Sequence, residues 1–206
     1  MGLIKGEPNT EIARPADGWR LPAAVLILAT LLVFGGESTR EWLRFEPDAI
    51  AAGEVWRLIT GHLVHLGWSH FALDAVGLGL VWYLVGHAFK ATGWAIVAMA
   101  SVCAIDLGLW FVNPELQWYV GLSGVLHGIL AAGIIVSCRQ PRIELLALGF
   151  LLLAKLIWEQ FYGPLPGSEG SSGGPVVVAA HLYGAIGGGL AGILALLIRV
   201  RPAGRI

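Results

Sequence analysis

Long apolar runs alternate with short polar segments along the chain, and this pattern predicts helices that span a membrane. Six runs have this character: 21–36, 69–88, 92–112, 121–138, 142–160 and 176–198. A spanning helix needs about 20 residues, so we expect the first and fourth helices to be short or recessed. The pattern predicts an all-α membrane protein with a bundle of six transmembrane helices.

Composition supports the same class. Hydrophobic residues make up 56% of the 206 positions and charged residues only 13%, whereas soluble domains average about 25% charged residues. The net charge of −1 gives no argument for a nucleic-acid partner. We expect one membrane domain over 21–199, flanked by cytoplasmic segments 1–20 and 200–206. No small-x-small cleavage site follows the first run, which is therefore expected to remain as a helix.

The positive charges at the ends of the runs predict the orientation of the bundle. Three arginines lie on one side, Arg40, Arg44 and Arg57. Nine basic residues lie on the other: Lys5, Arg14, Arg20, Lys90, Arg139, Arg142, Arg199, Arg201 and Arg205. Basic loops stay in the cytoplasm, so both termini are expected there. Cys103 and Cys138 fall at opposite ends of this bundle and are not expected to pair.

Ionisable residues of the apolar runs concentrate in the predicted outer half. The second, fourth and sixth helices all run from outside to inside in this topology. They carry, near their starts, the chemically competent side chains His70, Asp74, Ser123, His127 and His181. Asp106 lies near the outer end of the third helix. Polar groups inside a bilayer are costly and mark function, and a one-sided pocket suits chemistry that needs water better than it suits a pore.

Ser123 and His181 are candidates for a nucleophile and its base. Gly124 and Gly128 lie four residues apart on the fourth helix, and Gly184 and Gly188 do so on the sixth. Such stripes of small residues let helix backbones approach closely. Close approach would bring the Ser123 hydroxyl within hydrogen-bond reach of His181, as general-base catalysis requires.

Acyl transfer also needs donors for a developing oxyanion. The backbone N–H of Ser123 is one candidate because the first amides of a helix lack intrahelical partners. His70 is a second candidate, and Asp74 is a third if it is protonated. Alternatively, Asp74 is ionised and holds His70 or another imidazole in place. His127 is expected to orient or electrostatically tune His181, or to pack in a small polar cavity.

Two loops and one pair of charges complete the pattern. Segment 37–68 is too long for a plain hairpin and is interpreted as an outer-face segment lying partly in the membrane interface. Segment 162–175 is rich in Gly, Ser and Pro, so we expect no regular structure there, and it serves as a linker or as a lid over the pocket. Lys155 and Glu159 are one turn apart in the fifth helix and are expected to pair.

These residues resemble the rhomboid family of intramembrane serine proteases, from about Glu54 to Gly192. The motifs that carry the resemblance are Trp56-Arg57, His70 with Asp74, Gly121-Leu122-Ser123-Gly124, and Ala180-His181 with Gly184 and Gly188. The resemblance implies a six-helix fold, a Ser123/His181 dyad and cleavage of membrane-anchored proteins near the outer face. It implies no cofactor or metal, and it includes Gly121 among the residues that support the oxyanion.

Two positions depart from the usual family pattern. Asp74 stands where the family usually has Asn, and His127 stands where many members have Tyr. His127 within Gly-Leu-Ser-Gly-Val-Leu-His-Gly resembles the rhombosortase branch. That resemblance implies substrates with a C-terminal sorting tail that contains Gly-Gly, one membrane helix and basic residues. Together with the orientation predicted above, we expect a multi-pass protein of the cell (inner) membrane whose active site faces the extracytoplasmic side.

Three other functions are compatible with parts of the sequence. A zinc-dependent membrane hydrolase would draw its ligands from His62, His65, His70, Asp74, His127 and His181. An inactive rhomboid-like protein would bind membrane clients without cutting them. A transporter is disfavoured because the inner half of the bundle is nearly apolar.

Overall fold

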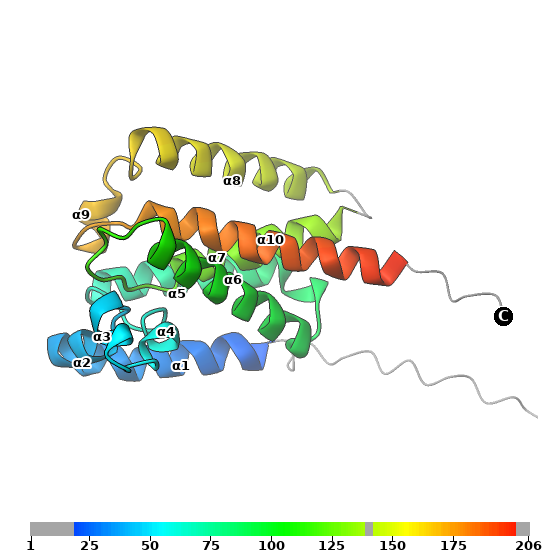
Figure 1. The fold of residues 1–206 in the computed structure, drawn as a ribbon. Helices are drawn as coiled ribbons and strands as arrows, with labels where there is room; N and C mark the ends of the chain where they lie inside the picture. The colour runs from blue at the N-terminus through cyan, green and yellow to red at the C-terminus, as the bar shows by residue number, and fades with distance from the viewer. Residues whose placement is uncertain (1–18, 139–141, 201–206) are drawn as a thin grey trace, which may run out of the picture.

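The structure is a computed structural model that describes residues 19–138 and 142–200 (Figure 1). Within these ranges, the helices of 15 residues or more are α1 (Arg20–Phe34), α5 (Trp68–Val85), α6 (Ala91–Phe111), α7 (Ser123–Ser137), α8 (Ile143–Tyr162) and α10 (Val178–Val200). The shorter ones are α2 (Gly36–Leu43), α3 (Pro47–Ala51), α4 (Arg57–Thr60), η2 (Gly86–Ala88) and α9 (Ser168–Ser172). The predicted all-α class is confirmed, and the long helices match the six apolar runs.

The long helices differ in their capacity to cross a membrane. In the described part of the chain, four helices are long and apolar enough to cross a membrane: α6, α8, α10, and α5 continued by η2. Helix α1 qualifies only together with α2, to which it is bent by 117°, and α7 is a shorter apolar helix of 15 residues. The expectation that the first and fourth helices are short is therefore confirmed, whereas six crossings and cytoplasmic termini remain predictions.

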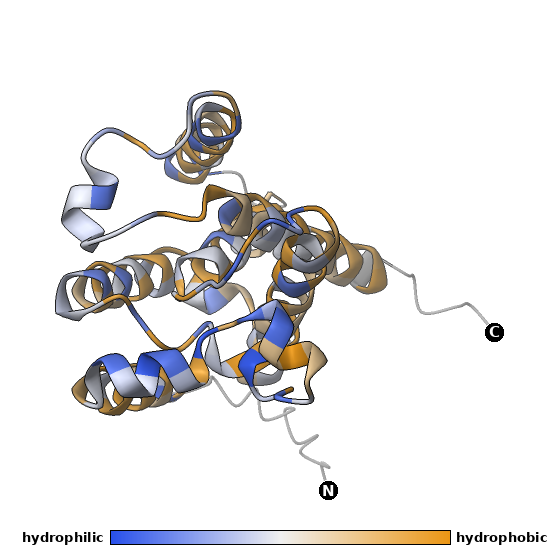
Figure 2. Cartoon of the chain, turned by 60° about the vertical axis from the view of Figure 1, so that its left-hand side comes forward, coloured by the Kyte–Doolittle hydropathy of each residue, from blue (hydrophilic) through white to orange (hydrophobic). Residues whose placement is uncertain are grey.

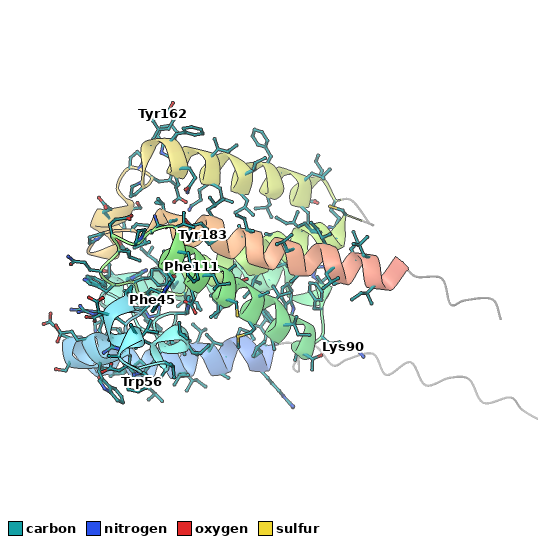
Figure 3. The ribbon with its side chains drawn as sticks, viewed as in Figure 1. Phe45, Trp56, Lys90, Phe111, Tyr162 and Tyr183 are labelled. Atoms are coloured by element: carbon teal, nitrogen blue, oxygen red, sulfur yellow. The ribbon has the colours of Figure 1, made fainter. Side chains whose placement is uncertain are left out.

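The two ends of the bundle differ in polarity. Helix α1 begins and α10 finishes at the same end (Figure 1), and Lys90 lies there as well, opposite Trp56 (Figure 3). The other end carries α2, α3, α4 and α9, and most of the hydrophilic colour in Figure 2 gathers in these short helices and loops. The expected cytoplasmic segments 1–20 and 200–206 lie almost entirely outside the described residues.

Helix α7 lies at the centre of the bundle against α10 (Figure 1). A Cβ added to Gly184 would collide with the carbonyl oxygen of Gly124, and one added to Gly188 would collide with that of Gly128. Only hydrogen atoms on these α-carbons leave room for the two backbones, as glycine stripes do in membrane proteins. The predicted close approach of the fourth and sixth helices is confirmed, and it fixes the side chains that the two helices carry.

Helix α8 lies at the margin of the bundle (Figure 1). Only 17% of its apolar window is buried inside the protein, and Phe150 and Phe161 are among its strongly exposed side chains. Its buried residues are Leu145, Leu156 and Glu159. Glu159, the charged residue among these three, therefore faces the bundle interior rather than lipid.

The segment between α1 and α5 is anchored by Arg57. This buried side chain donates to the carbonyl oxygens of Glu41 (2.8 Å) and Arg44 (2.9 Å) and pairs with Glu54 (2.6 Å). Phe45, fully buried near the loop end of the bundle (Figure 3), exchanges two backbone hydrogen bonds with Tyr119, of 3.0 and 2.9 Å. Arg57 thus ties the segment together internally, and the Phe45–Tyr119 pair holds it against the chain that leads into α7.

The exposed aromatic residues of this segment fit the predicted interfacial position. The rings of Trp42 and Trp56 lie 5.7 Å apart, with 62% and 40% of each residue exposed. Tryptophan is favoured where membrane meets water. The interfacial position itself remains a prediction.

The expectation that 162–175 contains no regular structure is wrong, because α9 forms one short helix there. Gly167 and Gly173 flank it with φ of +82° and +80°, which only glycine adopts without strain. Ser172 is buried, and its carbonyl oxygen accepts a hydrogen bond from the Ser69 hydroxyl at 3.3 Å. Tertiary contact with α5 therefore stabilises a turn that local composition disfavours. Cys103 and Cys138 are unpaired, as expected.

Candidate active site

Ser123 is the first residue of α7, and the chain before it is held by two hydrogen bonds to the backbone of Gly121. The Gly121 N–H donates to the carbonyl oxygen of Gly61 (3.0 Å), and the Tyr119 hydroxyl donates to that of Gly121 (2.7 Å). Gly121 has a φ of +125°, a conformation that favours glycine. The turn that presents Ser123 is thus fixed on both sides.

His181 meets Ser123 from the first turn of α10. Its Nε2 lies 2.9 Å from Ser123 Oγ, within the normal range of a hydrogen bond. Only 6% of His181 is exposed. The hydroxyl and imidazole that the sequence singled out, 58 positions apart, are in contact inside the bundle.

His127 lies one turn below Ser123, with its ring stacked on that of His181. The ring centroids are 4.3 Å apart and the planes differ by 17°. His127 Nδ1 is 2.7 Å from the carbonyl oxygen of Ser123, to which it donates. The ring therefore covers one face of the His181 imidazole, as a supporting residue would.

Glu159 is the residue of this site that sequence reasoning did not assign to it. Its Oε2 lies 2.9 Å from His181 Nδ1, and its Oε1 accepts a hydrogen bond of 2.6 Å from Lys155. The predicted Lys155–Glu159 pair is therefore present. The spacing of four residues predicted the pair. The sequence of α8 is apolar on most of its faces, so it did not indicate that the face carrying Glu159 packs toward α10.

Asp74 contacts the turn that precedes Ser123 through a single oxygen. Its Oδ2 accepts the Leu122 N–H at 2.9 Å and lies 3.1 Å from His65 Nε2. His70 Nε2 is farther from it, at 3.6 Å. Of the two imidazoles near this carboxyl group, His65 is thus the one within hydrogen-bond distance.

The tautomer of His70 follows from a backbone contact. The Leu66 N–H donates to His70 Nδ1 at 3.3 Å. Neutral imidazole carries one proton, so the proton of His70 lies on Nε2. The absence of a side chain at Gly121 lets the His70 ring lie against its backbone, because a Cβ there would be 2.8 Å from His70 Cε1. His70 can therefore present an N–H beside the serine turn.

Replacing Gly121 with Ala is expected to lower the activity of this site more than about tenfold, since it displaces a candidate oxyanion donor. The new Cβ meets the His70 ring, and the positive φ adds roughly 1–3 kcal/mol of strain. Gly163→Ala is the matched control, because Gly163 has a φ of +80° and no heavy atom within 4 Å of its added Cβ. Initial rates per folded protein for the two variants separate the clash from the strain, and equal losses would contradict a role for the His70 contact.

The proposed zinc ligands divide into separate groups. His62 pairs with Asp106 (3.0 Å), His65 with Asp74, and His127 with His181. Among the described residues, one cluster could chelate an ion: His127, Glu159 and His181. However, a metal lies in the plane of each imidazole that binds it, and these two ring planes are nearly parallel. Both nitrogens of His181 also already face Ser123 and Glu159, so the geometry favours a serine site over a metal site.

The fold and the site together define the class, which is an integral multi-pass membrane protein with a serine and a histidine in contact inside its helices. The family model of the Rhomboid domain matches residues 52–198. The chain therefore belongs to the rhomboid family, whose enzymes are intramembrane serine proteases. A search of curated proteins found no match to this chain.

Proposed function

We propose that this protein is an intramembrane serine endopeptidase that uses Ser123 and His181. The single observation that carries the proposal is the 2.9 Å contact between Ser123 Oγ and His181 Nε2. Burial supports it, because a polar pair inside a bilayer is retained at a cost and therefore marks function. Membership of the rhomboid family supports the same class of reaction.

The reaction follows from the positions of the atoms. Ser123 Oγ attacks the scissile carbonyl carbon while His181 Nε2 takes the hydroxyl proton. The tetrahedral intermediate collapses as His181 returns that proton to the leaving amine, and an acyl-enzyme remains on Ser123. Water, activated by the same nitrogen, then hydrolyses the ester and restores the hydroxyl. No cofactor is needed for these steps.

Two donors are available for the oxyanion. The Ser123 N–H belongs to the first turn of α7, where amides lack intrahelical acceptors. The His70 Nε2–H lies beside Gly121. Both donors are held in place before negative charge develops on the substrate oxygen. They contribute to catalysis because they need not reorganise as that charge forms.

The substrates that we propose are membrane-anchored proteins with a C-terminal sorting tail containing Gly-Gly, as in the rhombosortase branch. His127, within Gly-Leu-Ser-Gly-Val-Leu-His-Gly, is the residue that supports this assignment. We further propose a membrane domain over 21–199 that crosses the bilayer six times, with cytoplasmic termini. The site would then open to the extracytoplasmic side of the cell (inner) membrane.

A reconstituted assay tests the function and the substrate class together. Purified protein in lipid vesicles is mixed with a reporter anchored by one membrane helix, which carries a Gly-Gly motif before the helix and basic residues after it. We expect cleavage of this reporter and slower cleavage of a reporter whose Gly-Gly is changed to Val-Val. Cleavage of both at equal rates would reject the sorting-tail specificity, and cleavage of neither by folded protein would count against the protease.

Asp74→Asn is expected to retain activity within about threefold. Asp74→Ala is expected to lose more than about tenfold, because the buried Leu122 N–H and His65 both lose their partner. Asn is tolerated because only Oδ2 is engaged, by the Leu122 N–H and His65, and the amide oxygen of Asn can replace it. Cleavage rates and thermal midpoints of both variants check the prediction. Loss of activity in the Asn variant would instead indicate that the negative charge of Asp74 is required.

A further inference from the structure

The other nitrogen of His181 is held by a carboxylate. Glu159 Oε2 lies 2.9 Å from His181 Nδ1, and the two side chains are 3% and 8% exposed. Such burial removes the competing water and strengthens the interaction. Ser123, His181 and Glu159 therefore form a continuous line of hydrogen-bonding groups from α7 through α10 to α8.

This contact determines which nitrogen of His181 carries the proton. An ionised carboxylate can only accept a hydrogen bond, so the Glu159 contact requires a proton on His181 Nδ1. The lone pair of neutral imidazole then lies on Nε2, facing the Ser123 hydroxyl. That tautomer is the one a general base needs.

Lys155 competes for the same nitrogen. Its Nζ lies 3.3 Å from His181 Nδ1 and 2.6 Å from Glu159 Oε1. If Lys155 donated to Nδ1, the imidazole proton would move to Nε2, and His181 could no longer accept the serine proton. The shorter approach of Glu159 to Nδ1, together with its pairing of Lys155, opposes this inactive arrangement.

A purely structural role does not account for the geometry. A Lys–Glu pair one turn apart forms equally well on an exposed helix face and contributes a few tenths of a kcal/mol. Here the carboxylate is instead turned inward from the most exposed long helix of the bundle, where burying it costs free energy unless it is well paired. Its second oxygen is directed at the base.

We infer that Glu159 is a positioning residue that completes a Ser123–His181–Glu159 triad, and that Lys155 makes this residue essential by competing for His181 Nδ1. The inference rests on the proposed protease function. It assigns Glu159 a role in the rate of the chemical step and none in substrate binding.

Four variants test it in the vesicle assay, with kcat, KM and thermal midpoint measured for each. Glu159→Gln keeps the shape, but Lys155 attracts the new amide oxygen and leaves the amide N–H facing His181 Nδ1. Lys155→Met removes the competitor, and the double variant lets the amide oxygen turn to His181. Glu144→Gln is the matched control, since Glu144 lies at the other end of α8 with a 64% exposed side chain.

We expect Glu159→Gln to lower kcat by about 10² or more, because a wrong tautomer costs up to roughly 10⁴ in a soluble triad. KM should stay within about threefold. The kcat of Lys155→Met should remain within about tenfold of that of the unmodified protein. The kcat of the double variant should exceed that of Glu159→Gln by at least about tenfold, because the effects of residues that act together are not additive. Glu144→Gln should have no effect. If Glu159→Gln is poorly folded, Glu159→Asp, which keeps an acceptor for Nδ1, should retain more kcat per folded molecule than Glu159→Ala.

Two outcomes overturn the inference while leaving the protease intact. One is Ser123-dependent cleavage by Glu159→Gln at a kcat within threefold of the unmodified protein. The other is a double variant no more active than Glu159→Gln. Cleavage that does not depend on Ser123, or no cleavage by the folded unmodified protein, would count against the proposed function itself.

Discussion

Replacing Ser123 with Ala is expected to lower cleavage of a membrane-anchored reporter by at least about 10³-fold, because the attacking oxygen is lost and only binding and oxyanion stabilisation remain. The change removes one atom from the first residue of α7, so the fold should persist. The measurement is the initial rate of reporter cleavage in vesicles, with the thermal midpoint as a check on folding.

Ser137→Ala is the matched control for this prediction. Ser137 is the last residue of the same helix, at the end opposite Ser123. Its replacement should leave the rate unchanged within about twofold, as surface or helix-end substitutions usually do. Residual activity of several per cent in Ser123→Ala, in protein free of contaminating protease, would contradict the assignment of the nucleophile.

Gly184→Ala is expected to produce the second large loss, about 10²-fold in cleavage rate, because displacing catalytic groups by about 1 Å costs that much. The added Cβ would overlap the Gly124 carbonyl oxygen. Helices α7 and α10 must then separate, and they carry Ser123 and His181 respectively. The overpacking should also destabilise the protein by about 1–3 kcal/mol.

Gly189→Ala distinguishes crowding from a general effect of altering α10. A Cβ at Gly189 meets only Ile135 Cδ1, at an ordinary 3.5 Å. This variant should match or slightly exceed the stability of the unmodified protein, since Ala is favoured over Gly in helices by roughly 0.5–1 kcal/mol. Cleavage rates and thermal midpoints of both variants make the comparison. Equal cleavage rates and thermal midpoints in Gly184→Ala and Gly189→Ala would mean that close packing of α7 on α10 does not position the site.

Much of the fold could be predicted because each membrane-spanning helix is encoded by a local run of apolar residues. Each long helix coincides with an apolar run to within a few residues, and the short lengths of α1 and α7 follow from the lengths of their runs. The contact between Ser123 and His181 could also be predicted, since Gly184 and Gly124 indicated which helix faces meet.

The remaining site contacts depend on tertiary structure. Lys155 and Glu159 were expected to pair, but α8 is apolar around most of its surface, so its sequence does not fix which face turns inward. The contact of Asp74 with the Leu122 N–H depends on how α5 is placed against the turn before α7. Helix α9 depends on contacts with Ser69, which local Gly and Ser content could not indicate.

The most direct test of the central claim, a nucleophilic Ser123 activated by His181, is labelling of the purified protein with a fluorophosphonate probe followed by mapping of the modified residue by mass spectrometry. The probe reacts with serines whose hydroxyl is activated by a neighbouring base. We predict one adduct on Ser123 in the unmodified protein, with labelling strongly reduced in His181→Gln and absent in Ser123→Ala. No adduct on Ser123 in folded, membrane-reconstituted protein, or labelling that is unaffected by His181→Gln, would contradict the account.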